Sequence, residues 1–137
     1  MAEKTTDLDQ LLILFQRRYN ILREIKEITD ELAEASSRHD GVSVELELQM
    51  RMDKLQLCDR NWQDICMHGE NGDEAQKNLF RSLVLEDPED AHSSVPKEEK
   101  LYEIRRACRK LIREIQERDR IISLQTVHDK SFYYQKL

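Results

Sequence analysis

Turn-forming residues are so scarce in this chain that they restrict it to long helices. Among 137 residues there are three glycines and two prolines, whereas leucine, isoleucine, glutamate, arginine and lysine are abundant. Such a composition is typical of long helices. A β-sandwich or barrel needs a turn every ~8–12 residues, and this chain lacks the glycine and proline to make them. A doubly wound nucleotide fold is disfavoured because the sequence has no glycine-rich phosphate loop. We therefore predict an all-α protein.

Residues 6–37 carry the clearest helical periodicity. Their apolar side chains follow steps of three and four, and a second row recurs at intervals of seven. Together the rows make a stripe broader than the seam of a two-stranded coiled coil, as a helix needs when it packs against two neighbours. The first row is Leu8, Leu11, Phe15, Arg18, Leu22, Ile25, Thr29 and Leu32, and the second is Leu14, Ile21, Ile28 and Ala35. Arg18 is thus a long cation on a core position.

Residues 42–68 present two conflicting periods. From Val42 to Met52 apolar and polar residues alternate, which is the period of a strand. Most of these residues are nevertheless strong helix formers. In addition, Leu48, Leu55 and Trp62 recur at intervals of seven over a stretch without a turn. We predict a helix over 42–68 with Trp62 in the core.

The rest of the chain divides at turn signals. Residues 69–73 are a turn by composition, and Asp73 with Gln76 has the spacing of a capping box, so a short helix is predicted over 73–85. Residues 86–96 are acidic and small, which predicts a solvated linker. Steps of three and four then predict a helix over 97–130, followed by an aromatic tail over 131–137.

These segments predict a single domain over residues 1–137. We expect an elongated antiparallel helical bundle, or coiled-coil hairpin, of three long helices plus one short helix. No stretch reaches the ~18 consecutive apolar residues of a membrane span, and we find no secretory signal, so we expect a cytoplasmic protein. The three cysteines show no framework spacing, which predicts free thiols.

Side chains that could support catalysis or bind a metal do not converge in the sequence. None of the four histidines lies four residues from another histidine or from a cysteine, so we expect no metal, no cofactor and no enzymatic activity. Arginines flank Cys108 and would lower its thiol pKa if they faced it, but its spacing predicts a core position. An enzymatic alternative stays open, because residues 22–32 resemble the first helix of chorismate mutases. In that case Arg18 and Arg23 would hold a dicarboxylate.

Charge is distributed unevenly along the chain, whose net charge is −6. Residues 97–137 carry 11 basic and 7 acidic side chains, whereas residues 1–96 carry 11 and 21. Because the two parts belong to one domain, we expect the basic run over 105–113 to pair internally. Nucleic-acid binding would need a larger basic surface without acidic competitors, so no nucleic-acid partner is expected.

Two stretches resemble the FlgN-type flagellar export chaperones of bacteria. Over residues 28–55 the sequence ITDELAEASSRHDGVSVELELQMRMDKL forms a helix end, a short break at Asp40 and Gly41, and a second helix. Over residues 111–125 the sequence LIREIQERDRIISLQ is similar to the closing helix of that family. Asp119 stands where the family often has Asn, and the aromatic tail departs from its pattern. FlgN-type and FliT-type members therefore both stay open.

The resemblance implies a non-catalytic cytoplasmic chaperone. It would bind the amphipathic terminal helices of hook–filament junction proteins and deliver them to the flagellar export apparatus, as a monomer or weak homodimer. The last helix is the expected lender of an apolar face to the client, because it follows the acidic linker. The expected partner-binding residues are Leu111, Ile112, Ile115, Ile122, Leu124, Phe132, Tyr133 and Tyr134.

Two alternatives stay open. For the aliphatic residues of the last helix, the alternative is ordinary core packing. For the whole protein, it is a structural or adaptor coiled coil with an unknown protein partner, in one form a homodimer.

Overall fold

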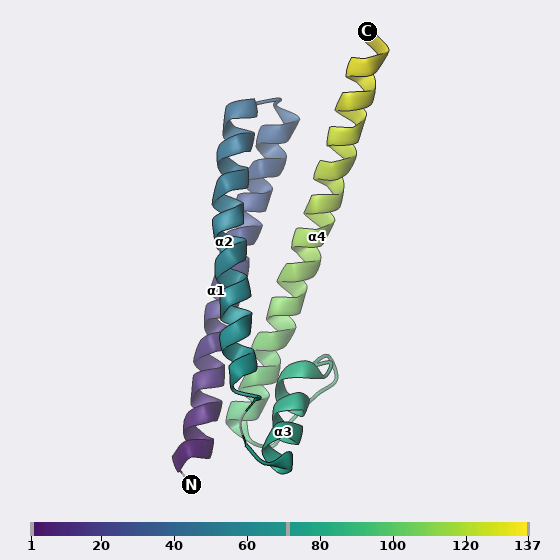
Figure 1. The fold of residues 1–137 in the computed structure, drawn as a ribbon. Helices are drawn as coiled ribbons and strands as arrows, with labels where there is room; N and C mark the ends of the chain where they lie inside the picture. Colours follow the sequence, from purple (N-terminus) through teal and green to yellow (C-terminus); the bar gives the residue numbers. More distant parts are fainter. Residues whose placement is uncertain (1, 71, 137) are drawn as a thin grey trace.

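The computed structural model describes the backbone of residues 2–70 and 72–136 and the side chains of residues 8–70 and 72–124. Within these residues the chain is helical and contains no strand, so the all-α prediction is confirmed. The long helices are α1 (Ala2–Ser37), α2 (Gly41–Met67) and α4 (Pro96–Lys136). Between α2 and α4 lie the short α3 (Glu74–Phe80) and one π-helical segment, η1 (Arg81–Leu85). In the ribbon, α1 runs upward, α2 returns beside it, and α4 runs in the same direction as α1 (Figure 1).

Local sequence signals account for most helix ends. The side chain of Asp40 caps α2 by accepting a hydrogen bond from the Ser43 backbone N–H at 3.1 Å. The predicted capping box of α3 is present, with Asp73 and Gln76 each accepting from the other's backbone N–H at 2.8 and 2.9 Å. Two boundaries differ from the prediction: α1 begins at Ala2, and α4 continues to Lys136 through the expected tail. Within the described residues, none of these helices combines the length and the apolarity that a bilayer span requires.

α1 is the central helix, and α2 and α4 pack against two sides of it. On the α2 side, Asn61 donates a hydrogen bond to a backbone carbonyl of α1 at 2.9 Å. On the α4 side, Lys97 pairs with Asp9 at 2.7 Å and Arg118 pairs with Asp30 at 3.0 Å, so the two helices run in parallel. Within the described residues, no Cα atom of α2 lies within 8 Å of a Cα atom of α4. The broad stripe of α1 therefore serves two neighbours, as its width predicted.

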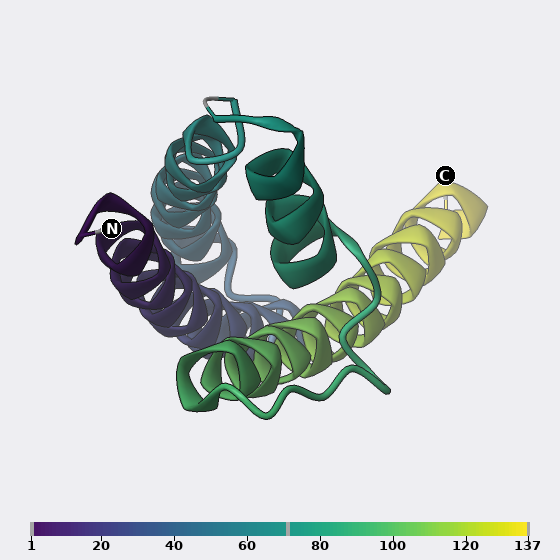
Figure 2. The ribbon, with the colours of Figure 1, turned by 90° about the horizontal axis from the view of Figure 1, so that it is seen from below.

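The core divides into a lower and an upper cluster, where lower means the N-terminal end of α1 (Figure 1). The lower cluster draws on α1, α2, η1 and α4 and consists of Leu11, Leu14, Phe15, Ile65, Leu83, Val84, Leu101 and Tyr102. The upper cluster draws on the three long helices alone and consists of Leu22, Ile25, Cys58, Cys108 and Ile115. Seen along the helices, α3 lies between α2 and α4, on the side away from α1 (Figure 2). Among the described residues, this corner is filled by α3 and η1 at the lower end only.

Residues 86–95 are mostly exposed, as expected of a solvated linker, but several of them also contact α4. Arg106 donates hydrogen bonds to the backbone carbonyls of Pro88 and Ala91, both at 2.9 Å. Arg109 forms an ion pair with Asp87, and Pro88 is fully buried. The expected internal pairing of the basic run is confirmed. Its arginines also bind backbone carbonyls, which the charge pattern of the sequence does not reveal.

Candidate functional site

The predicted binding residues of α4 divide between core and surface. Ile115 is 7% exposed and belongs to the upper cluster, and Leu111 and Ile112 pack against that cluster. Ile122 is half-buried, whereas Leu124 is 58% exposed. Three further predicted residues have side chains outside the described part of the chain: Phe132, Tyr133 and Tyr134. Within the described residues, the ridge of α4 is therefore core at its lower end and reaches solvent at Leu124.

The lower half of α4 is anchored by a buried arginine. Arg105 is 8% exposed and donates hydrogen bonds to the backbone carbonyls of Leu83, at 2.7 Å, and Glu86. Burial lowers the pKa of Arg105 below its ordinary value. A cation with this degree of burial requires such acceptors, because desolvation without them is costly. This part of α4 is thus attached to η1 and to the segment that follows it, which opposes release of the helix.

Most of the large apolar side chains that are exposed in the described residues lie on α2, which we did not expect. Scattered apolar residues are ordinary at a protein surface, but a contiguous group indicates an interaction site. The exposed apolar residues of α2 are Val42, Leu46, Leu48, Met50, Met52, Leu55, Leu57 and Met67.

One group of these residues lies on the side of α2 that is directed toward α4. The direction is given by Arg51, whose Nη2 lies 2.6 Å from Oδ2 of Asp119 on α4. Leu48 and Leu55 lie three residues before and four after Arg51, which places them on the same side of the helix. They are 49% and 40% exposed, and Met52 between them is 55% exposed. We call Leu48, Arg51, Met52 and Leu55 the open face.

The open face continues a row that is covered lower down. Trp62 follows Leu55 by seven residues and packs against the lower cluster, to which η1 contributes Leu83 and Val84. Above the end of η1, no described element occupies the corresponding position beside Leu48 and Leu55. The heptad row that predicted core packing is therefore partly covered at Trp62 and half-exposed above it.

A second exposed row lies on the other flank of α2. Leu46, Met50 and Leu57 are 60%, 42% and 40% exposed. The buried line of α2 that faces α1, including Cys58 and Asn61, separates this row from the open face. We call these three residues the outer row.

Arg18 lies at the lower end of the open face. Its Nη1 donates to the backbone carbonyl of Cys58 at 3.4 Å and to its Sγ at 3.5 Å. The guanidinium carbon lies 5.1 Å from the centroid of the Trp62 ring, a cation–π geometry. Among the described side chains, no carboxylate oxygen lies within 4.0 Å of the guanidinium nitrogens. The predicted core position of Arg18 thus holds a half-buried positive charge that no anion of the described residues neutralises.

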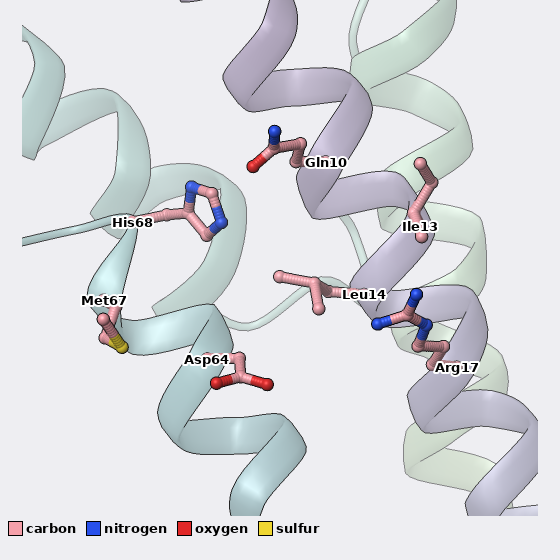
Figure 3. Close-up of a pocket in the computed structure, with 7 residues that line it drawn as sticks. All are labelled: Gln10, Ile13, Leu14, Arg17, Asp64, Met67 and His68. Atoms are coloured by element: carbon pink, nitrogen blue, oxygen red, sulfur yellow. The ribbon is translucent and has the colours of Figure 1, made fainter.

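A separate cleft of about 570 Å³ lies between α1 and α2. Figure 3 shows Asp64 of α2 and His68, which follows the end of α2, facing Gln10 and Arg17 of α1 across it. The other lining residues are Ile13, Leu14 and Met67. None of these seven side chains is a hydroxyl or thiol nucleophile.

The cysteines have the structural character that their spacing predicted. Cys58, Cys66 and Cys108 are free thiols, and Cys58 and Cys108 are buried. Burial raises the pKa of Cys108 to about 11, so its arginine neighbours do not activate it. Across residues 8–70 and 72–124, no three metal-ligating side chains come together.

Comparison with models of known families, with curated proteins and with solved structures finds no match to this chain. The function of the candidate site is therefore inferred from the geometry of its residues.

The open face was missed at the level of sequence, although one signal could have located it. Alternating apolar residues from Val42 to Met52 distribute apolar side chains around the whole circumference of a helix. Neighbours on one side cannot cover all of them. Alternation of apolar and polar residues within a helix therefore indicates that part of its apolar surface stays exposed.

Proposed function

We propose that this protein is a non-catalytic cytoplasmic export chaperone that binds an amphipathic terminal helix of a partner protein on the open face. The resemblance of residues 28–55 and 111–125 to FlgN-type chaperones makes hook–filament junction proteins the expected clients. The proposal is carried by one observation: Leu48, Met52 and Leu55 are exposed on the side of α2 that is directed toward α4.

The physical basis of the proposal is that a bound helix would fill the space between α2 and α4 above η1. The expected bundle is antiparallel only for α2, since α4 runs parallel to α1. A fourth helix beside α2 and α4 would cover the open face. Below the open face, Leu83 and Val84 of η1 belong to the cluster against which Trp62 packs. Burying the exposed parts of Leu48, Met52 and Leu55 contributes about 1 kcal/mol each. When it binds, the amphipathic client helix also buries its own apolar face against the open face.

The proposal is tested with synthetic peptides of the terminal helices of hook–filament junction proteins, labelled for fluorescence anisotropy. We expect Leu48→Glu with Leu55→Glu to weaken binding at least tenfold, because both charges enter the apolar contact. The matched control is Leu46→Glu with Leu57→Glu, which places the same charges on the outer row. Equal affinity of wild type and the open-face variant, with far-UV circular dichroism unchanged, would contradict the proposal.

A second candidate function is a structural or adaptor protein that forms a homodimer through the outer row. Leu46, Met50 and Leu57 favour it, because they recur at the spacing of a helix–helix seam and are exposed. Sedimentation equilibrium distinguishes the two functions. A tight dimer that Leu46→Glu with Leu57→Glu dissociates supports the adaptor, whereas a monomer in both proteins excludes it.

A further inference from the structure

Arg18, at the lower end of the open face, carries a positive charge that forms no ion pair with the described carboxylates. Arg18 lies on the core stripe of α1, yet it keeps partial exposure to solvent. Its two hydrogen bonds, both to Cys58, are long, at 3.4 and 3.5 Å. The nearest ion pair between α2 and α4 joins Asp119 to Arg51, and no described carboxylate forms an ion pair with Arg18. The guanidinium is thus held by Trp62 and remains able to accept an anionic partner.

We propose that Arg18 binds the C-terminal carboxylate of the helix that occupies the open face. This inference rests on the proposed function and specifies the chemistry and direction of its ligand. The bound helix would run downward, as α2 does, with its last turn above η1. An anion that reached Arg18 would form charge-assisted hydrogen bonds while Trp62 holds the guanidinium plane in place.

The charges around this end of the open face favour one helix direction. Arg105 lies about one turn below Cys108 on α4, and Cys108 packs in one cluster with Cys58, which Arg18 contacts. A helix carries a partial negative charge at its C-terminus and a partial positive charge at its N-terminus. Two arginines therefore attract the C-terminal end of a bound helix and repel the N-terminal end.

The end of η1 gives a second reason for this direction. A bound helix entering with its N-terminus could donate to the last carbonyls of η1. However, the carbonyls of Leu83 and Glu86 already accept hydrogen bonds from Arg105. The N–H groups of an incoming N-terminus would therefore find these two acceptors occupied. The carboxylate of an incoming C-terminus would instead meet Arg18.

The part of α2 that lies above Trp62 limits the size of the ligand. From Gly41 to Cys58, a stretch that contains the open face, α2 rises roughly 25 Å at 1.5 Å per residue, or about five helical turns. The inference therefore describes a terminal helix of about this length that ends in a free carboxylate. An internal helix of a folded protein would lack the carboxylate.

The test uses two synthetic peptides of one amphipathic sequence of about five turns, with leucines at heptad spacing and no tryptophan. One ends in a free carboxylate and the other in an amide. Trp62 is the single tryptophan of the chain and contacts Arg18, so its fluorescence reports binding without a label. We expect the wild-type protein to bind the carboxylate peptide about five- to tenfold more tightly than the amide peptide.

Variants of neighbouring arginines assign this preference to one side chain. Arg18→Gln is expected to reduce the ratio of the two affinities to about one, and Arg18→Lys to retain part of it. Arg17→Gln is the matched control, because Arg17 is exposed and lines the cleft on the other side of α1. It is expected to keep the full ratio.

The outcomes separate this inference from the proposed function. Equal binding of the two peptides by wild type would overturn the role of Arg18 and leave helix binding intact. This comparison needs no variant, so it stands even if Arg18→Gln fails to fold. A full carboxylate preference in a folded Arg18→Gln protein would also overturn the role. If wild type binds neither these peptides nor the junction-protein peptides, the proposed function fails as well.

Discussion

Nη2 of Arg51 lies 2.6 Å from Oδ2 of Asp119, and this ion pair connects α2 to α4 at a level where their backbones stay apart. The Arg51 side chain is 17% exposed and that of Asp119 is 38% exposed. Nε of Arg51 is buried without a hydrogen-bond partner in the described structure. The pair therefore bridges the open corner at the cost of one unsatisfied donor, and a strong contribution to stability is not expected of it.

We predict that Asp119→Asn lowers the free energy of unfolding by about 0.5 kcal/mol, the magnitude of a partly exposed ion pair. The larger effect is local, because the substitution loosens the upper half of α4. Hydrogen exchange of amides 112–124 is expected to accelerate several-fold more than that of α1. Glu117→Gln is the control, since it removes only a pair with Arg120 on the same helix. Equal acceleration by both variants would show that the bridge does not hold α4.

Ile115 and Leu124 are expected to respond oppositely to truncation, although both belong to the predicted ridge of α4. Ile115→Ala leaves a cavity in the upper cluster and is predicted to cost about 2–4 kcal/mol. Leu124→Ala removes an exposed side chain and is predicted to change stability by less than about 0.5 kcal/mol. Urea unfolding followed by circular dichroism measures both. A small effect of both substitutions would mean that α4 does not pack on α1 at this level.

Glu47 makes the α1–α2 hairpin sensitive to pH. Burial, together with the nearby carboxylate of Glu31, raises the pKa of Glu47 above its ordinary value of 4.5. A raised folded pKa means that the folded protein holds this proton to higher pH than the unfolded chain. Stability therefore falls as pH rises from about 4.5 through the folded pKa.

We predict that Glu47→Gln is more stable than wild type at pH 7.5, by about 0.5 kcal/mol, and nearly equal to it at pH 4. Urea titrations at the two pH values check this prediction, and Glu45→Gln on the exposed side of α2 is the control. A stability difference of the same size at both pH values would contradict the assigned cause.

The three thiols are expected to react at very different rates. With a pKa of about 11, Cys108 has roughly one part in a thousand of reactive thiolate at pH 8, and it is also buried. We predict that an aromatic disulfide reagent modifies the partly exposed Cys66 first and Cys108 at least about 100-fold more slowly. Cys66→Ser is expected to remove the fast phase. A fast phase that persists in this variant would place a second thiol at the surface.

Much of the secondary structure was predictable because its signals are local. Steps of three and four identified α1 and α4, intervals of seven identified α2, and Asp73 with Gln76 identified the start of α3. The end of α1 near Ser37 and the start of α2 at Gly41 agree with the prediction within a residue. Each of these features depends on side chains within one or two turns of one another.

The candidate site was less predictable, because coverage of a helix face depends on distant elements. Leu48, Leu55 and Trp62 follow a uniform heptad spacing, so the sequence alone predicts the same burial for all three. Trp62 packs against the lower cluster, to which η1 contributes two residues, whereas Leu48 and Leu55 stay exposed. The ridge of α4 shows the reverse case, since contact with α1 buries Ile115, which we expected to bind a partner.

Taken alone, the order of residues determined that the chain is helical, where α1 ends and where α2 and α3 begin, and that the basic run of α4 would pair internally. Hydrogen bonding and apolar spacing within a few turns are enough for this. The tertiary structure decided which apolar surfaces stay exposed and that Arg18 carries an unneutralised charge beside Trp62. Those properties depend on how far each helix extends along its neighbours, and this length is set by packing between segments distant in the sequence.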